Sequence, residues 1–224
     1  MERPTTRPDA APSRLIAVTI VGVGLIGLGV LLGWAIFLRG DDPFAVDVWW
    51  NDLLVEWWVP AIGGFSRVMN WLGGGWFGVL AVPIIGAGAL VLLRRPWSAA
   101  YFLAAEIGSV AVVQVMKHVF GRVRPDEILV LSDVGSYPSG HVANAATIAT
   151  VAVVLFPRLS VVVAGSVWVL LMAFSRTYLH AHWLSDTVGG ALAGTGAALV
   201  VAAVFWSQIS RERSDAADRR IAVE

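Results

Sequence analysis

Three short segments of this chain combine cations, histidines and a carboxylate in patterns that suit phosphate chemistry. They are Lys117–Pro125 (KHVFGRVRP), Tyr137–His141 (YPSGH) and Ser175–Asp186 (SRTYLHAHWLSD). The first holds the only lysine of the chain, and together they hold all four histidines. Such residues can bind a phosphate, attack its phosphorus atom and protonate a leaving oxygen.

The first segment supplies two cations. Lys117 and Arg124 are about two helical turns apart, so an uninterrupted helix would aim both side chains the same way. Gly121 and Pro125 are expected to end that helix and leave Arg124 on a more adaptable segment. Arginine offers phosphate a planar fork and lysine a compact charge. Taken alone, however, the two cations are better explained as side chains reaching from a helix end toward water.

The second segment predicts the start of a helix that can hold an anion. Ser139 is a favoured N-cap residue, and Gly140 lets a ligand approach the backbone closely. The free N–H groups and the positive dipole end of such a helix attract anions. His141 would lie in the first turn, facing the bound anion.

The third segment pairs a histidine with a carboxylate. His182 and Asp186 are four residues apart, which places them on one face of a helix start. A carboxylate that accepts one ring N–H leaves the other nitrogen as a lone-pair nucleophile. Arg176 adds a third cation. A metal site of His180, His182 and Asp186 is the alternative, but two histidines two residues apart do not share a helix face, so His180 is expected to be structural.

In combination the segments resemble the three signatures of the type 2 phosphatidic acid phosphatases. Lys117-x6-Arg124-Pro125, Pro138-Ser139-Gly140-His141 and Ser175-Arg176-x5-His182-x3-Asp186 meet every fixed position in order. The match covers only part of the chain, and a helical layout outside it resembles the integral-membrane branch of this family.

The resemblance implies a role for each residue. His182 would be the nucleophile that forms a phosphohistidine, with Asp186 orienting it. His141 would protonate the leaving oxygen and then activate water. The remaining signature residues would hold the phosphoryl oxygens: Lys117, Arg124, Ser139, Gly140 and Arg176. No metal or other cofactor is implied.

Composition indicates what must position these segments. The chain is 57% hydrophobic and 14% charged, whereas soluble domains are about a quarter charged, so a polytopic all-α membrane protein is predicted. A span needs about 20 apolar residues. Six runs approach that length: Leu15–Leu38, Trp71–Leu93, Trp97–Met116, Val142–Phe156, Leu159–Phe174 and Thr187–Trp206.

Arginines in alternate loops orient the predicted bundle with both termini in the cytoplasm. The expected organisation is a cytoplasmic segment (1–14), a six-helix membrane domain (15–206) and a solvated, frayed cytoplasmic tail (207–224). All three chemical segments then lie on the extracytoplasmic face of the cell membrane. The net charge of zero indicates no nucleic-acid partner, and no pattern indicates an oligomer, although one is possible.

Three features outside the signatures have two interpretations each. Val48–Trp58 is an amphipathic helix lying at the membrane surface, with a polar side of Asp47, Asn51, Asp52 and Glu56, or it is a loop packed on its neighbours. Glu106, in the third span, is a functional group or a packing hydrogen bond, of which packing is preferred. Residues 126–137 form a lid or merely a connector.

The function predicted from the sequence is a metal-independent lipid phosphatase of the outer leaflet. The resemblance favours undecaprenyl pyrophosphate as substrate, with phosphatidylglycerophosphate, phosphatidic acid and diacylglycerol pyrophosphate as competitors. A lipid phosphotransferase is a neighbouring possibility, because a phosphohistidine can also react with an alcohol. A non-catalytic lipid-binding or transport protein would need only the cations, and the two histidines and the carboxylate argue against it.

Overall fold

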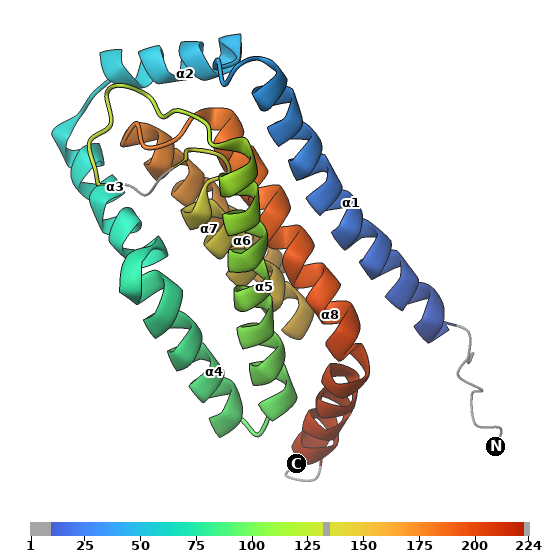
Figure 1. Ribbon diagram of the computed structural model, residues 1–224. Coiled ribbons are helices and arrows are strands. Elements are labelled where there is room, and N and C mark those ends of the chain that lie inside the picture. Colours follow the sequence, from blue (N-terminus) through green and yellow to red (C-terminus); the bar gives the residue numbers. More distant parts are fainter. Residues whose placement is uncertain (1–9, 132–134, 222–224) are drawn as a thin grey trace.

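The described residues form a bundle of helices. The computed structural model describes residues 10–131 and 135–221, and these contain helices but no strands. In chain order the elements are α1 (Ala10–Leu38), α2 (Ala45–Glu56), α3 (Pro60–Gly73), the π-helix η1 (Phe77–Ala81), α4 (Val82–Leu92), α5 (Pro96–Phe120), α6 (Gly140–Leu155), α7 (Leu159–Tyr178) and α8 (Leu184–Ile221). Helix α2 lies across one end of the bundle, whereas α1 begins and α8 ends at the opposite end (Figure 1). The predicted all-helical class is confirmed for these residues.

Several helices suit a membrane. Among the described residues, α1, α5, α7 and α8 contain four stretches long and apolar enough to cross one. Helices α3 and α4, joined through η1 and bent by 45°, give a fifth candidate if the pair forms one span. Helix α6 is apolar but has only 16 residues, which rise about 24 Å against a hydrocarbon thickness of about 30 Å. Length and composition therefore support four to five spans, and a sixth depends on α6.

The second apolar run differs from its prediction. It was expected to be one helix from Trp71 to Leu93, but α3 already begins at Pro60, whose ring suits a first helical turn. The helix then breaks after Gly73, and Gly75 adopts a positive φ of 56° that side chains disfavour. The apolar run alone did not reveal that its first glycines separate α3 from η1 and α4.

Helix α5 ends as its sequence predicts. Gly121 adopts a left-handed conformation with a φ of 50°, and its N–H donates a hydrogen bond to the carbonyl of Lys117. A glycine in this conformation commonly closes a helix because it carries no Cβ. The chain leaves the helix here, so Arg124 lies on the connection between α5 and α6.

Helix α8 is the central element, packing against α1, α5 and α6. A Cβ on Gly190 would lie 2.4 Å from the carbonyl oxygen of Ser139, and one on Gly194 would lie 2.2 Å from that of Ala143. These glycines therefore let α8 approach the start of α6 within one molecule. The contact fixes the second chemical segment against the third.

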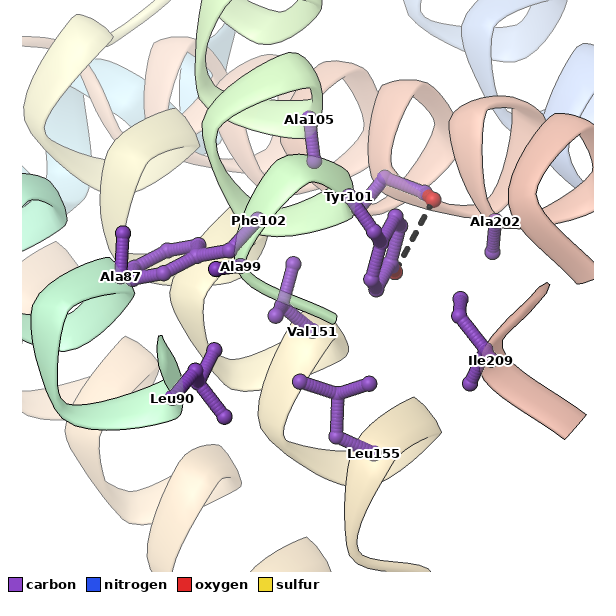
Figure 2. Packing of buried hydrophobic residues seen from close by; sticks show 11 residues of the cluster. Ala87, Leu90, Ala99, Tyr101, Phe102, Ala105, Val151, Leu155, Ala202 and Ile209 are labelled. Carbon is purple, nitrogen blue, oxygen red and sulfur yellow. Dashed lines mark hydrogen bonds between the residues drawn. The ribbon is translucent and has the colours of Figure 1, made fainter. Parts of the chain in front are cut away.

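The core at the other end of the bundle consists largely of small and aliphatic side chains. Figure 2 shows the cluster that joins α4, α5, α6 and α8, including Ala87, Leu90, Ala99, Tyr101, Phe102, Ala105, Val151, Leu155, Ala202 and Ile209. The Tyr101 hydroxyl donates to the carbonyl of Ala198 at 3.2 Å, which satisfies a polar group in this apolar setting.

The predicted frayed tail is wrong for the described residues. Helix α8 continues beyond Trp206 to Ile221. The buried carboxylate of Glu212 explains why, because it accepts hydrogen bonds from the N–H groups of Trp97 and Ser98 at 2.6 and 2.9 Å. These are otherwise unpaired donors of the first turn of α5, so the extension of α8 caps another helix.

Candidate active site

The three chemical segments meet at the end of the bundle on which α2 lies. They enclose a cavity of about 300 Å³. Its wall includes five residues of the predicted site: Lys117, Gly140, His141, Arg176 and His182. The end of α5, the start of α6, the end of α7 and the α7–α8 connection therefore converge on one space.

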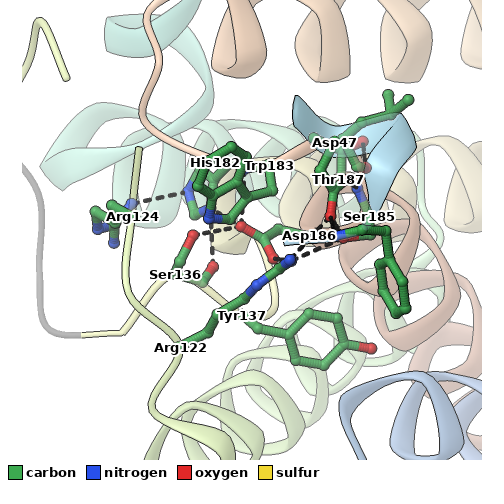
Figure 3. Close-up of polar contacts among 12 residues, drawn as sticks. Asp47, Arg122, Arg124, Ser136, Tyr137, His182, Trp183, Ser185, Asp186 and Thr187 are labelled. Carbon is green, nitrogen blue, oxygen red and sulfur yellow. Dashed lines mark hydrogen bonds and ion pairs between the residues drawn. The ribbon is translucent and has the colours of Figure 1, made fainter. Parts of the chain in front are cut away.

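His182 is held in a defined orientation and tautomer. Its Nδ1 lies 2.8 Å from the backbone carbonyl of Ser136, which can only accept, so Nδ1 carries the proton (Figure 3). The lone pair is then on Nε2, which lies 3.3 Å from Nη1 of Arg124.

Charge and burial favour the neutral form of this ring. Burial lowers the pKa of His182 well below its ordinary value, and the charges of Arg176, Arg124 and Lys117 lower it further. A neutral imidazole with a directed lone pair is the reactive form of a histidine nucleophile.

Asp186 supports His182 less directly than predicted. Its Oδ2 lies 3.6 Å from Nδ1 of His182, beyond a hydrogen bond. The oxygens of Asp186 accept instead from Arg122 Nη1 at 2.7 Å, from the Trp183 N–H at 2.9 Å and from the Ser136 hydroxyl. The carboxylate thus fixes Ser136, whose carbonyl orients the ring. Figure 3 shows this arrangement.

Arg122 connects the carboxylate of Asp186 to α2. Its guanidinium bridges Asp186 at 2.7 Å and Asp47 at 2.8 Å, and the side chains of all three are fully buried. Asp47 also accepts from the N–H and the hydroxyl of Ser185 at 2.8 and 2.7 Å. One cation between two carboxylates, with further donors, satisfies the pairing that buried charges require.

Helix α2 confirms the predicted helix but buries its polar side. Asp47 is fully buried and Asn51 is 7% exposed, whereas Trp49 and Trp57 are 59% and 65% exposed. Asp47 and Asn51 therefore face the site beneath the helix, whereas Asp52 and Glu56 are exposed. The outward indoles are typical of a surface that meets lipid headgroups.

Two cations of the site share backbone acceptors. Lys117 Nζ donates to the carbonyl of Gly135 at 2.7 Å, and Arg124 Nη2 donates to the same oxygen at 2.9 Å. Arg124 also donates to the carbonyl of Ala181. These contacts aim the charges of both cations at the third segment. The buried Arg176 donates to the side-chain oxygen of Asn70 on α3.

His141 lies against the break in α3. Its Nε2 lies 3.1 Å from the carbonyl of Asn70, which assigns the proton to Nε2 in the neutral ring. A Cβ on Gly74 would lie only 2.0 Å from that nitrogen, so the absence of a side chain there makes room for the ring.

Ser139 precedes the first turn of α6, as predicted, but its side chain does not cap the helix. Its hydroxyl is buried and has no partner among the described residues. The Ser139 N–H donates to the carbonyl of Asp186 at 3.0 Å, which joins the start of α6 to the third segment. A buried hydroxyl beside the Gly140 N–H suits a phosphoryl oxygen.

His180 lies outside this cluster. Its Nδ1 contacts the side-chain oxygen of Asn51 at 2.7 Å, and burial lowers its pKa while Glu127 opposes the shift. Within residues 10–131 and 135–221, no three His, Cys, Asp or Glu residues gather in a way that could hold a metal ion.

Sequence reasoning missed several supporting residues. Arg122 lies inside the first segment but received no role, Asp47 was assigned only to a polar helix face, and Ser136, Asn70 and Gly74 were not singled out. The one available signal was Arg122, an additional arginine two residues before a signature arginine. Of the segment 126–137, Leu131 lines the cavity, and residues 132–134 lie outside the described residues.

Comparison with known proteins gives a family match. The model of the PAP2 superfamily matches residues 98–210. A phosphatidylglycerophosphatase B of Bacillus subtilis is 35% identical over 53% of this chain, and a decaprenylphosphoryl-5-phosphoribose phosphatase of Mycobacterium tuberculosis is 32% identical over 69%. The matches span 63% and 87% of the lengths of those two proteins. A lipid A 1-phosphatase of Rhizobium johnstonii is 28% identical, and the match spans 48% of its length.

Solved structures share the fold. A transmembrane PAP2-type phosphatidylglycerolphosphate phosphatase of Bacillus subtilis superposes with a TM-score of 0.71 at 25% identity, over 81% of this chain and 94% of that one. Aquifex aeolicus LpxE gives a TM-score of 0.62 at 24% identity, over 70% and 95% of the two chains.

Proposed function

The chain belongs to the PAP2 superfamily, and we propose that it is a lipid phosphatase that works through a phosphohistidine without a metal ion. One observation carries the mechanism. The Ser136 carbonyl holds the proton of His182 on Nδ1, which leaves the Nε2 lone pair beside Arg124 at the cavity that Lys117, His141 and Arg176 also line.

The proposed first step is attack on the lipid phosphate. The Nε2 lone pair of His182 forms a bond to phosphorus while the bond from phosphorus to the leaving oxygen breaks. The leaving oxygen keeps that electron pair and takes a proton from the imidazolium form of His141, which returns to its neutral ring. The cations and the Ser139–Gly140 donors stabilise the charge on the phosphoryl oxygens, where one preorganised donor contributes about 3 kcal/mol.

The second step releases phosphate. His141, now deprotonated, accepts a proton from water as the water oxygen attacks phosphorus. The bond from phosphorus to Nε2 breaks, and its electron pair returns to His182. Ser136 and Asp186 keep the ring in place through both steps.

The proposed location is the extracytoplasmic face of the cell membrane. Helices α6 and α7 have 16 and 20 residues; α6 begins at the site, and α7 ends there. At 1.5 Å per residue they rise about 24 and 30 Å, which places the cavity near the headgroup boundary of a bilayer. A phosphate attached to a membrane lipid reaches that depth. The orientation, with six spans and cytoplasmic termini, is the one that the arginine distribution predicts.

Undecaprenyl pyrophosphate is the substrate that the sequence predicts, and the relatives named above widen the choice. Their names specify phosphatidylglycerophosphate, lipid A 1-phosphate and decaprenylphosphoryl-5-phosphoribose as what those proteins act on. A substrate panel for this chain therefore includes a polyprenyl pyrophosphate, glycerol-based phosphates and a sugar-linked phosphate.

The test is phosphate release from this panel in detergent with excess EDTA. Wild-type protein is compared with His182→Ala and with His118→Ala, since His118 is an exposed histidine whose ring contacts the Gln114 carbonyl. We expect release by wild type and His118→Ala and loss by His182→Ala. Equal release by His182→Ala would exclude this nucleophile, and activity that EDTA abolishes and added metal restores would exclude the metal-free mechanism. Release that requires an added alcohol would identify a phosphotransferase.

A further inference from the structure

The cavity at the site continues beyond the phosphate-binding residues. Besides the histidines and cations, its wall includes Glu106, Ser109 and Asn144, with the glycines of the α3–η1 break opposite. Asn144 lies one helical turn below His141 on α6. Glu106 lies 11 residues before Lys117 on α5, which is about 16 Å along the helix axis. The space therefore leads from the phosphate toward the middle of the bundle.

Asn144 lines this space and carries an unpaired hydrogen-bond acceptor. Its Nδ2 donates to the carbonyls of Gly73 and Gly78, each at 3.1 Å, and carbonyls only accept. These two bonds fix which end of the amide is nitrogen. The opposite atom, Oδ1, has no partner among the described residues. It is also shielded from water, because Asn144 is only 7% exposed.

Glu106 presents a second acceptor deeper in the cavity. Its side chain is also 7% exposed, and its Oε1 has no partner in the described part of the chain. Buried polar atoms are rarely left unpaired, because such an atom loses its hydrogen bonds to water without a replacement. Two such oxygens on the wall of the catalytic cavity indicate that a ligand supplies the missing donors.

We propose that this part of the cavity binds hydroxyl groups of the lipid alcohol that carries the phosphate. Asn144 accepts from a hydroxyl beside the phosphate, and Glu106 accepts from a larger polyol or sugar. This inference rests on the proposed phosphatase activity and ranks its substrates. It favours lipid phosphates whose alcohol keeps free hydroxyl groups, such as phosphatidylglycerophosphate or a sugar phosphate, over undecaprenyl pyrophosphate, whose terminal phosphate is joined to a second phosphate and then to hydrocarbon.

A matched pair of lipids tests the Asn144 acceptor without a mutation. Lysophosphatidic acid carries a free hydroxyl on the carbon next to the phosphorylated one, and its 2-deoxy analogue has hydrogen there. We expect wild type to prefer the hydroxyl lipid by about tenfold or more in kcat/KM, the effect of one buried hydrogen bond to the substrate. Equal values would mean that the acceptor holds only water, and the inference would be wrong.

The Glu106→Leu variant tests the deeper acceptor. An acylated glucosamine 1-phosphate is compared with lysophosphatidic acid, and Glu56→Leu, an exposed change on α2, is the control. We expect Glu106→Leu to lose at least about tenfold in kcat/KM on the sugar lipid only. Its Tm should stay unchanged or rise, because an apolar group replaces an unpaired buried one. An equal loss on both lipids, or none, would overturn the assignment of Glu106.

Failure of this inference is distinguishable from failure of the proposed function. If wild type hydrolyses both members of the lysophosphatidic acid pair equally, the phosphatase stands and the hydroxyl subsite does not. If it hydrolyses no member of the panel, the proposed function itself fails.

Discussion

Replacing Asp47 by asparagine tests the buried connection between α2 and the catalytic carboxylate. The carboxylate of Asp47 accepts four hydrogen bonds: from Arg122 Nη2 at 2.8 Å, from the N–H and hydroxyl of Ser185 at 2.8 and 2.7 Å, and from the Phe44 N–H at 3.1 Å. An amide has the same shape but only one accepting atom. Its NH2 group would face donors, and Arg122 would lose one of its two buried counter-charges.

The cost follows from the burial of both partners. Removing one member of a fully buried ion pair destabilises a protein by about 3–5 kcal/mol, because the other charge stays buried without compensation. In a domain of this size each kcal/mol lowers Tm by about 2–4 °C. Asp47→Asn is therefore expected to lower Tm by roughly 10 °C.

Thermal unfolding in detergent, followed by circular dichroism, measures this change. Asp52→Asn is the matched control, because Asp52 lies on the same helix and is exposed. Its Tm should stay within about 2 °C of wild type, as for most exposed substitutions. If the two variants unfold at the same temperature, the bridge from Asp47 through Arg122 does not stabilise the site.

Three further predictions concern other parts of the structure. Burial and nearby cations lower the pKa of His182, so an NMR titration should place the midpoint of its protonation well below the ordinary value of about 6.5. The folded protein should also lose stability as pH falls below about 6.5, because the unfolded chain then binds the proton that the buried ring does not. A midpoint at or above that value would contradict the geometry. Gly74→Ala should reduce kcat/KM by about 100-fold, because the added methyl group would displace His141. The control variant Gly64→Ala should keep the wild-type kcat/KM, because Gly64 faces open space. Equal activities of the two variants would refute the predicted displacement. Glu212→Gln should lower Tm by several degrees without changing kcat/KM, because it weakens the cap of α5; an unchanged Tm would refute that role.

The sequence predicts the residues of the site better than their supports. His141, His182, Asp186 and the cations are recognisable because their types and spacings suit one chemistry, and the structure brings them together. Asp47 and Arg122 are 75 residues apart, and nothing local shows that a helix crossing the bundle end will place them in contact. Long-range pairing of this kind depends on the packing of α2, which hydrophobic pattern alone does not specify.

The fold shows the same limit. Apolar runs predict where helices lie, and Gly121 ends α5 as expected because the cause is local. At the break after α3, the ring of His141 occupies the space that a side chain at Gly74 would need. The extension of α8 depends on N–H donors at the start of α5, which the carboxylate of Glu212 accepts. Both causes lie far away in the sequence.

Helix α2 also makes the lipid environment a component of the catalytic centre. One of its outward indoles, at Trp49, lies two residues after Asp47, which contacts Arg122, and Arg122 contacts Asp186. A force on this indole, such as a change in lateral pressure or in headgroup spacing, would reach the ring of His182 through two ion pairs and the Ser136 carbonyl. Turnover measured in micelles and in bilayers of defined composition should therefore differ in kcat as well as in substrate access.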